Sequence, residues 1–97
     1  MTERQMRADT YMKQGEAAYK AITCYEDIDR WIEAEMAVFA MVRRLKDNVA
    51  ATVIICRYML REPWQKIADY MGYTAKHCHV LQLKALDTIA DILEASE

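Results

Sequence analysis

Glycine and proline are scarce in this chain of 97 residues, which contains two Gly and one Pro. A β-sandwich or barrel needs many tight turns, and those turns usually contain Gly, Pro, Asn or Asp. The scarcity therefore argues against an all-β fold. It also argues against a glycine-rich phosphate-binding loop, because Gly15 and Gly72 stand alone in the sequence.

The sequence also lacks a long apolar run, an apolar leader and paired cysteines. Its longest mostly apolar stretch, residues 49–60, is too short to span a bilayer. The charged start MTERQMRADT is not typical of a signal peptide. Cys24, Cys56 and Cys78 are odd in number and form no C-x-x-C pair, which argues against a disulfide framework. We therefore expect a protein of the reducing cytoplasm that does not enter a membrane.

What is present is a globular balance of residue types and a small net charge. Hydrophobic residues make up 54% of the chain and charged residues 29%, which excludes a disordered tail. The formal net charge is −2, a mild argument against a simple basic nucleic-acid binder. The charge is unevenly distributed, however. Residues 57–84 contain five basic and two acidic side chains, and the stretch beyond them is acidic.

The N-terminal half has the apolar spacing of helices. One stripe recurs at steps of seven, four and three, which predicts a coiled-coil-like face. Three residues at positions of this stripe are not apolar: Gly15, Asp29 and Arg43. Asp29 and Arg43 are candidates to pair across a dimer. A second stripe begins at Ile28, so residues 27–45 are predicted to form a central helix that packs on two sides. The first stripe comprises Tyr11, Ala18, Ile22, Tyr25, Ile32, Met36 and Phe39, and the second Ile28, Trp31, Val38, Met41, Val42 and Leu45.

Whether the first half forms one helix or two is left open by the sequence. Thr23-x-x-Glu26 matches a capping box, which favours a break near Thr23. The alternative is one long helix to about Lys46. Thr2-x-x-Gln5 matches the same pattern at the start of the chain.

The second half is predicted to contain three helices. Asp47 and Asn48 are good N-caps for a buried helix over residues 49–60. Pro63 suits the first position of a short helix that ends at about Met71. Gly72 fits a left-handed position just past that helix, and Thr74 then caps a last helix that runs to about residue 95.

These elements predict an all-α fold of four or five helices. Residues 1–46 form a helical arm or hairpin that packs on the rest or dimerises, and residues 47–97 form a helix-turn-helix domain. That motif needs Ile67 buried, a small Ala68 at the helix crossing, and Gly72 at the turn. It also needs apolar side chains in the wedge between the two helices, and Met71, Cys78 and Leu81 are suitable for these positions.

The stretch WQKIADYMGYTAKHCHVLQLKAL resembles region 4 of bacterial sigma factors. It is more closely similar to small phage and prophage transcription regulators of the ArpU/RinA type. The resemblance covers residues 47–90. It departs from the family at Cys78, where a β-branched residue is usual, and at Val80 and Leu83, where polar side chains are expected. The matching residues are Arg57, Tyr58, Trp64, Ile67, Ala68, Met71, Gly72, Tyr73, Thr74, His77, Ala85 and Leu86.

The resemblance implies that the helix over residues 74–86 enters the major groove of double-stranded DNA. Lys76 can then bond guanine or phosphate, and the two imidazoles can donate to either, better when protonated. The candidate base-reading residues are Thr74, Ala75, Lys76, His77, His79 and Val80. The candidate phosphate contacts are Lys84, Lys66 and Arg61.

The predicted function is therefore sequence-specific DNA binding in transcriptional regulation, by a homodimer of phage or prophage origin that catalyses no reaction. Two alternatives stay open. One is a protein-interaction module that contacts RNA polymerase or a regulator without reading DNA. The other is a DNA-packaging protein that resembles a phage small terminase subunit.

Other chemistry is not indicated by the side chains of the second half. His77, Cys78 and His79 are adjacent on a helix and diverge by about 100° each, so they cannot converge on one metal ion. Cys78 points to the core, with no orienting acid for catalysis. Trp64 is predicted to pack beside Ile67 and the last helix rather than to stack on a base. No cofactor is expected.

Overall fold

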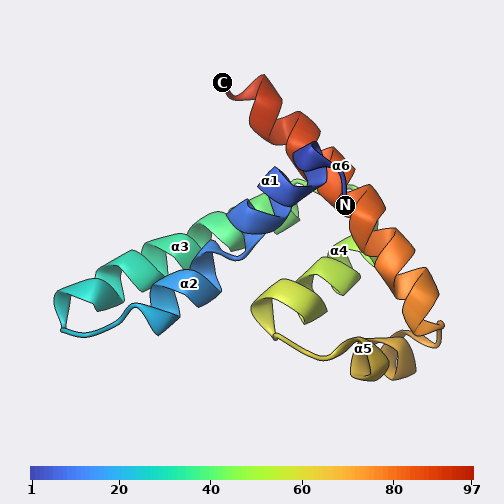
Figure 1. Cartoon of the computed structure of the whole chain (residues 1–97), viewed down its shortest axis with the longest axis horizontal. Helices are drawn as coiled ribbons and strands as arrows, with labels where there is room; N and C mark the ends of the chain where they lie inside the picture. The colour runs from blue at the N-terminus through green and yellow to red at the C-terminus, as the bar shows by residue number, and fades with distance from the viewer.

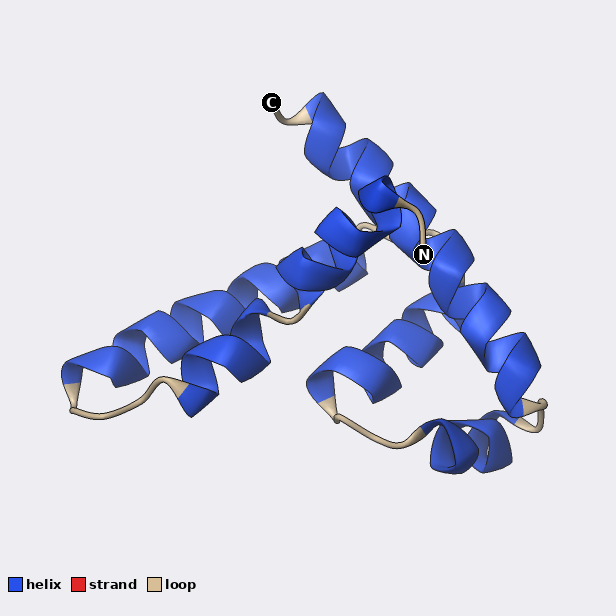
Figure 2. Cartoon of the chain, viewed as in Figure 1, coloured by secondary structure: helices blue, strands red, loops and turns tan.

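The computed structural model describes all 97 residues and contains only helices and their connections (Figure 2). This confirms the all-α class. The expected number of four or five helices is wrong, because there are six α-helices and one π-helix. They are α1 (Glu3–Met12), α2 (Gln14–Lys20), α3 (Glu26–Arg43), α4 (Asn48–Ile54), η1 (the π-helix, Ile55–Met59), α5 (Trp64–Met71) and α6 (Ala75–Ala95).

The N-terminal half contains three helices, so both predicted alternatives for it are wrong. A break does occur near Thr23, since α2 ends at Lys20 and α3 begins at Glu26. A second break at Lys13 divides α1 from α2, and this residue terminates one helix and precedes the next. The central helix expected over residues 27–45 is α3.

The two predicted capping boxes have different outcomes. The box at Thr2 is confirmed: its hydroxyl accepts from the Gln5 amide at 3.2 Å, and Gln5 Oε1 accepts from the Thr2 amide at 2.7 Å. The box at Thr23 is wrong. There the carboxylate of Asp27 reaches back and accepts from the backbone and hydroxyl of Thr23, each at 3.0 Å. The acceptor thus lies within the helix and the donors precede it.

The helices α2 and α3 run side by side as an arm that projects from the rest of the molecule (Figure 1). Tyr19 and Trp31 pack across this hairpin with ring centroids 5.6 Å apart. Gly15 faces the carboxylate of Glu35 on α3, and a Cβ at that position would lie 2.6 Å from Glu35 Oε1. A larger residue at position 15 would therefore require the Glu35 side chain to move.

The buried segment after Asp47 begins as expected and ends differently. Asp47 caps α4 by accepting from the amides of Val49 and Ala50. The expected single helix widens into the π-helix η1, which ends at Met59. Arg61, two residues later, has a left-handed φ of 56°. Pro63 occupies the N-cap position of α5 and not the first helical position, a difference of one residue.

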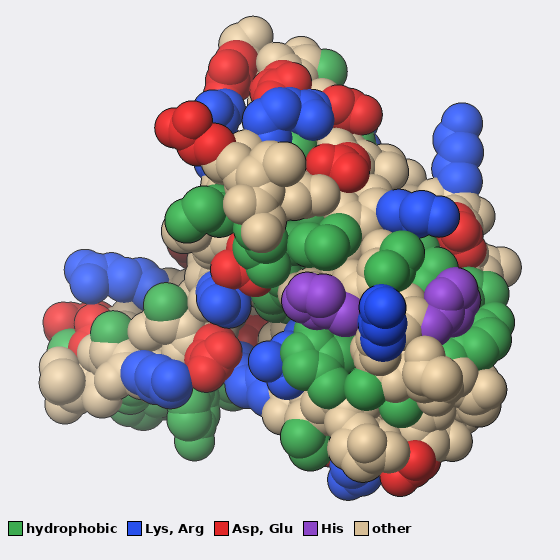
Figure 3. Space-filling model, turned by 45° about the vertical axis from the view of Figure 1, so that its right-hand side comes forward, with side chains coloured by type: hydrophobic (Ala, Val, Ile, Leu, Met, Phe, Trp, Pro, Cys, Tyr) green, Lys and Arg blue, Asp and Glu red, His purple; other side chains and the backbone are tan.

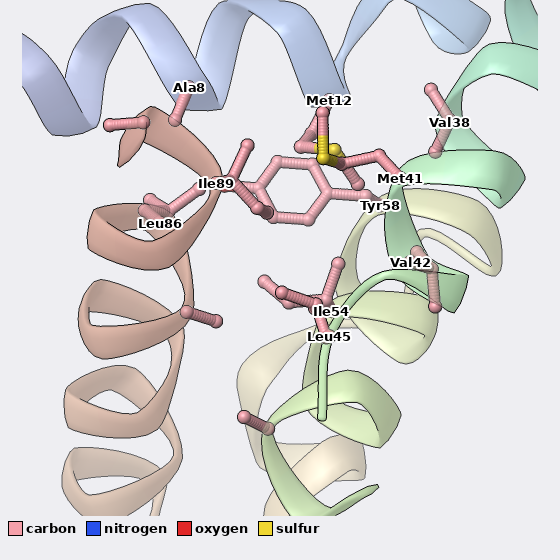
Figure 4. Close-up of a cluster of buried hydrophobic side chains, with 13 residues drawn as sticks. Ala8, Met12, Val38, Met41, Val42, Leu45, Ile54, Tyr58, Leu86 and Ile89 are labelled. Carbon is pink, nitrogen blue, oxygen red and sulfur yellow. The ribbon is translucent and has the colours of Figure 1, made fainter. Parts of the chain in front are cut away.

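The main hydrophobic core is shared by both halves of the chain (Figure 4). Met12 from α1 and Met41 from α3 lie beside Tyr58 from η1, with Leu86 and Ile89 from α6 facing them. The N-terminal helices therefore pack against the rest of the chain, which is one of the two arrangements expected for residues 1–46. The core comprises Ala8, Met12, Val38, Met41, Val42, Leu45, Ala50, Ile54, Tyr58, Ala85, Leu86, Ile89 and Ala90.

Ion pairs at the surface join the two ends of the chain. The guanidinium of Arg4 on α1 pairs with Asp91 and with Glu94, the latter at 2.7 Å, on α6. The acidic C-terminal stretch is thus matched by basic side chains of α1. All three cysteines are free thiols. None of the helices combines the length and the apolar character that crossing a membrane requires.

Candidate functional site

Two helices joined by a three-residue turn form the candidate site. The first, α5, ends at Met71, and Gly72 follows in the left-handed conformation with φ 74° and ψ 24°. The amides of Gly72 and Tyr73 both donate to the Ala68 carbonyl, at 2.9 and 3.2 Å. Thr74 then caps α6 by accepting from the His77 amide at 3.1 Å. Both the predicted glycine position and the predicted cap are confirmed.

A small second core holds this pair of helices together. It consists of Cys56 from η1, Ile67 and Ala68 from α5, and Cys78 from α6, all buried. Trp64, Met71 and Ala75 pack against it. The predicted packing of Ile67, Ala68, Met71, Trp64 and Cys78 is confirmed. Leu81, which was also expected in the wedge between the helices, is half-buried and does not belong to this core. Burial raises the pKa of the Cys56 thiol, so this group stays neutral.

The start of α6 carries most of the predicted site residues on its surface. Ala75 departs from the expectation of exposure, because it is half-buried against the small core. His77, Val80 and Lys84 are spaced by three and seven residues and therefore share one face of the helix. His79 is turned to another side, toward α5. The exposed members are Thr74, Lys76, His77, His79, Val80 and Lys84.

Aromatic contacts orient both histidine rings, which Figure 3 shows in purple on one visible face. His77 meets Tyr73 edge to face, with ring centroids 4.8 Å apart. His79 meets Trp64 in the same manner at 5.3 Å. The turn residue Tyr73 and the α5 residue Trp64 therefore restrict how the two imidazoles are presented.

The basic side chains between residues 57 and 84 differ in whether they form ion pairs. Lys66 pairs with Glu62 at 3.2 Å, one turn away on the chain, and Arg61 pairs with Glu35 of the arm at 2.9 Å. Lys76 and Lys84 form no ion pair and are exposed. The basic side chains of this region that form no ion pair are therefore Lys76 and Lys84 on α6 and Arg57 on η1.

Arg57 is a site residue that the sequence reasoning did not single out for a role. Its guanidinium lies 4.7 Å from the centroid of the Trp64 ring and donates to the Glu62 carbonyl at 3.0 Å. The same side chain lines a polar cavity of about 290 Å³ together with Arg61, Trp64 and His79. Trp64 lies seven positions after Arg57, but residues 60–63 between the two helices are not helical, so no helical periodicity signals this contact.

The wall of this cavity also contains a buried amide with an unused acceptor. Gln82 is 3% exposed, and its Nε2 donates to the Tyr58 hydroxyl at 2.9 Å. Its Oε1 has no hydrogen-bond partner. No three His, Cys, Asp or Glu side chains come close enough together to hold a metal ion.

Comparison with known proteins finds no matching family model, no matching curated protein and no matching solved structure.

Proposed function

We propose that the chain is a sequence-specific binder of double-stranded DNA that regulates transcription. The observation that carries the proposal is the pairing of α5 and α6 across the left-handed Gly72. This arrangement buries the contact between the two helices and leaves the capped start of α6 at the surface. A helix presented in this way fits the major groove with its first residues at the base edges, as in a helix-turn-helix.

Base reading would fall to the exposed side chains at the start of α6. Lys76 and His77 supply donors for guanine acceptors, and Val80 supplies an apolar contact for a thymine methyl. Lys84, one turn further along, is placed in sequence to reach a phosphate. The resemblance to sigma factor region 4 and to phage regulators of the ArpU/RinA type supports the same role and suggests a phage or prophage origin.

Few phosphate contacts are available to this surface. Lys66 and Arg61 must leave Glu62 and Glu35 before they can bind phosphate, whereas Lys84 is free to bind. With about three neutralised phosphates, the slope of log binding constant against log salt is about −3, which is shallow. Modest affinity of a single chain favours a homodimer that binds two half-sites.

The test is binding to duplex DNA from the region upstream of the chain's own coding sequence, measured by fluorescence anisotropy across a salt series. Replacement of both reading residues, Lys76→Ala with His77→Ala, is expected to weaken binding by at least about tenfold. A loss of about 1–3 kcal/mol is usual for a specific base contact. Lys20→Ala, which removes an exposed lysine from the arm, is the matched control and is expected to leave binding unchanged.

Two results would contradict the proposal. One is a wild-type chain that does not bind the duplex even at low salt. The other is equal binding by wild type and the double variant, which would remove α6 as the reading helix.

Contact with a protein such as RNA polymerase is a second candidate function of the same surface. It is favoured by three exposed apolar side chains, which are Val80 on α6, Tyr70 on α5 and Leu60 just after η1. Val80→Lys separates the two functions. The lysine removes the thymine-methyl contact but can bind a phosphate instead, so DNA binding should persist, whereas an apolar protein contact should be abolished. A phage small-terminase-like role in DNA packaging would instead require a ring of many copies, which sedimentation distinguishes from a dimer.

A further inference from the structure

The outer face of α3 carries a row of large apolar side chains that no other part of the chain covers. Ile32 is 44% exposed, Met36 66% and Phe39 50%. These side chains continue the heptad-like spacing of Tyr25 before the helix, at steps of seven, four and three. Spacing of this kind is typical of a helix that packs against another helix along a narrow seam.

The opposite face of α3 is already occupied. Trp31 and Glu35 turn toward α2, where they meet Tyr19 and Gly15, and Val38 and Val42 enter the main core. The exposed seam therefore does not take part in holding the arm to the rest of the molecule. Its apolar side chains are available to a partner outside the chain.

Charge along this seam changes sign from one end to the other. Asp29 lies on the seam seven residues before Met36, and Arg43 lies on it seven residues after. Beside the seam, Glu26 and Glu33 lie toward the start and Arg44 lies just after the helix. Arg30, the one cation near the start, is paired with Asp27 at 3.4 Å. At 1.5 Å per residue, the two seam charges lie about 10 Å on either side of Met36.

We propose that α3 pairs in antiparallel fashion with α3 of a second copy, with the two-fold axis near Met36. Asp29 of each copy then lies at the level of Arg43 of the other, and Ile32 lies near Phe39 of the other. The seam is thus complementary to itself in both apolar content and charge, as an isologous two-fold interface requires. A parallel pair would instead bring Asp29 to Asp29 and Arg43 to Arg43, which is unfavourable.

This interface lies on the arm, away from the start of α6, so dimerisation through α3 does not depend on the proposed DNA binding. A chain that binds no DNA can still dimerise through α3, and a failure of dimerisation leaves the DNA-binding test unaffected.

The orientation is tested by disulfide trapping in a Cys24→Ser background, because Cys24 is exposed while Cys56 and Cys78 are buried. Asp29→Cys and Arg43→Cys chains, one of them carrying a mass label, are mixed and oxidised mildly. The antiparallel pairing predicts the mixed disulfide between position 29 of one chain and position 43 of the other as the main product. Disulfides between identical positions would show a parallel pair and overturn the proposal.

The strength of the interface is tested by sedimentation equilibrium. Met36→Lys is expected to weaken dimerisation by at least about tenfold, since it places two lysines on the two-fold axis. Met6→Lys, at a methionine of α1 that is 56% exposed, is the matched control and should leave dimerisation unchanged. A wild-type chain that stays monomeric at its highest soluble concentration would overturn the proposal, as would equal effects of the two lysine variants.

A charge exchange separates pairing from a loss of folding. Asp29→Arg alone and Arg43→Asp alone should each weaken the dimer, because each places like charges opposite one another. The double variant restores opposite charges and should recover most of the affinity. Failure of the double variant to recover, with its helical circular dichroism unchanged, would rule out this register.

Discussion

The hydroxyl of Tyr58 is the polar centre of the main core. It donates to the carboxylate of Asp9 on α1 and accepts from the amide of Gln82 on α6. Burial and the hydrogen bond to Asp9 raise the pKa of this phenol well above its ordinary value, so the group remains a neutral donor. One side chain of η1 therefore connects both ends of the chain.

Tyr58→Phe is expected to lower the free energy of unfolding by about 1–3 kcal/mol. The change leaves the Gln82 amide with neither its donor nor its acceptor satisfied in a buried site. Adding Gln82→Leu to this variant should recover part of the loss, because both polar partners are then replaced by apolar groups. Urea denaturation of the two variants checks this, and a Tyr58→Phe chain as stable as wild type would contradict it.

At the candidate site, the sequence correctly predicted the structural role of a residue where that role depends only on its neighbours in the chain. Gly72 and Thr74 each act within three or four residues of the chain, through a left-handed backbone or a cap. The surroundings of Arg61 and Ala75 were not predicted from the sequence. Their environments are created by Glu35 of the arm and by the small core, which lie elsewhere in the sequence.

Among the elements, the start of α3 has an unusual cap. Asp27, inside the helix, accepts from the backbone amides of Thr23 and Cys24 and from the Thr23 hydroxyl. These hydrogen bonds favour the charged carboxylate and lower its pKa, the backbone bond from Thr23 contributing most. The loop between α2 and α3 therefore depends on an ionised Asp27.

The stabilisation supplied by Asp27 should depend on pH in acid. Because the folded-state pKa is depressed, the contribution is present above the unfolded value of about 3.9 and is lost as pH falls through the folded value. Hydrogen exchange at the Thr23 and Cys24 amides, corrected for the intrinsic rate, should show reduced protection at the acid end. Asp27→Asn should remove this pH dependence, and a pH-dependent step that persists in Asp27→Asn would contradict the assignment.

The helix boundaries illustrate what local signals predict. Asp47, Gly72 and Thr74 mark boundaries that are confirmed, because a cap or a left-handed residue is a short-range device. The widening of the buried helix into η1 has no such signal. Its side chains divide between two cores, with Tyr58 in the main core and Cys56 in the small one.

For the molecule as a whole, two cores of unequal size divide the hydrophobic packing. The main core joins α1, α3, α4, η1 and α6, while the small core holds α5 against α6 and η1. Side chains on both sides of the expected boundary at residue 46 contribute to the main core. We expect the main core to govern global unfolding and the small core to govern local opening of α5.

Matched truncations of one isoleucine in each core test this difference. Ile89→Ala removes a fully buried side chain from the main core and should cost about 2–5 kcal/mol in global stability. Ile67→Ala, equally buried in the small core, should accelerate hydrogen exchange of the α5 amides and leave the slowest amides of α1 and α6 protected. Equal loss of protection throughout the chain in both variants would contradict the division into two cores.

The sequence by itself determined the all-α class, the turn at Gly72 and the caps at Asp47 and Thr74, because helical periodicity and capping act over a few neighbouring residues. The tertiary structure alone decided that the N-terminal helices share a core with α6, that Arg61 pairs with Glu35, and that one apolar stripe of α3 stays outside. Those outcomes depend on which faces meet across long stretches of chain. An amphipathic stripe shows that a face will pack, but not whether its partner is another helix of the chain or a second copy.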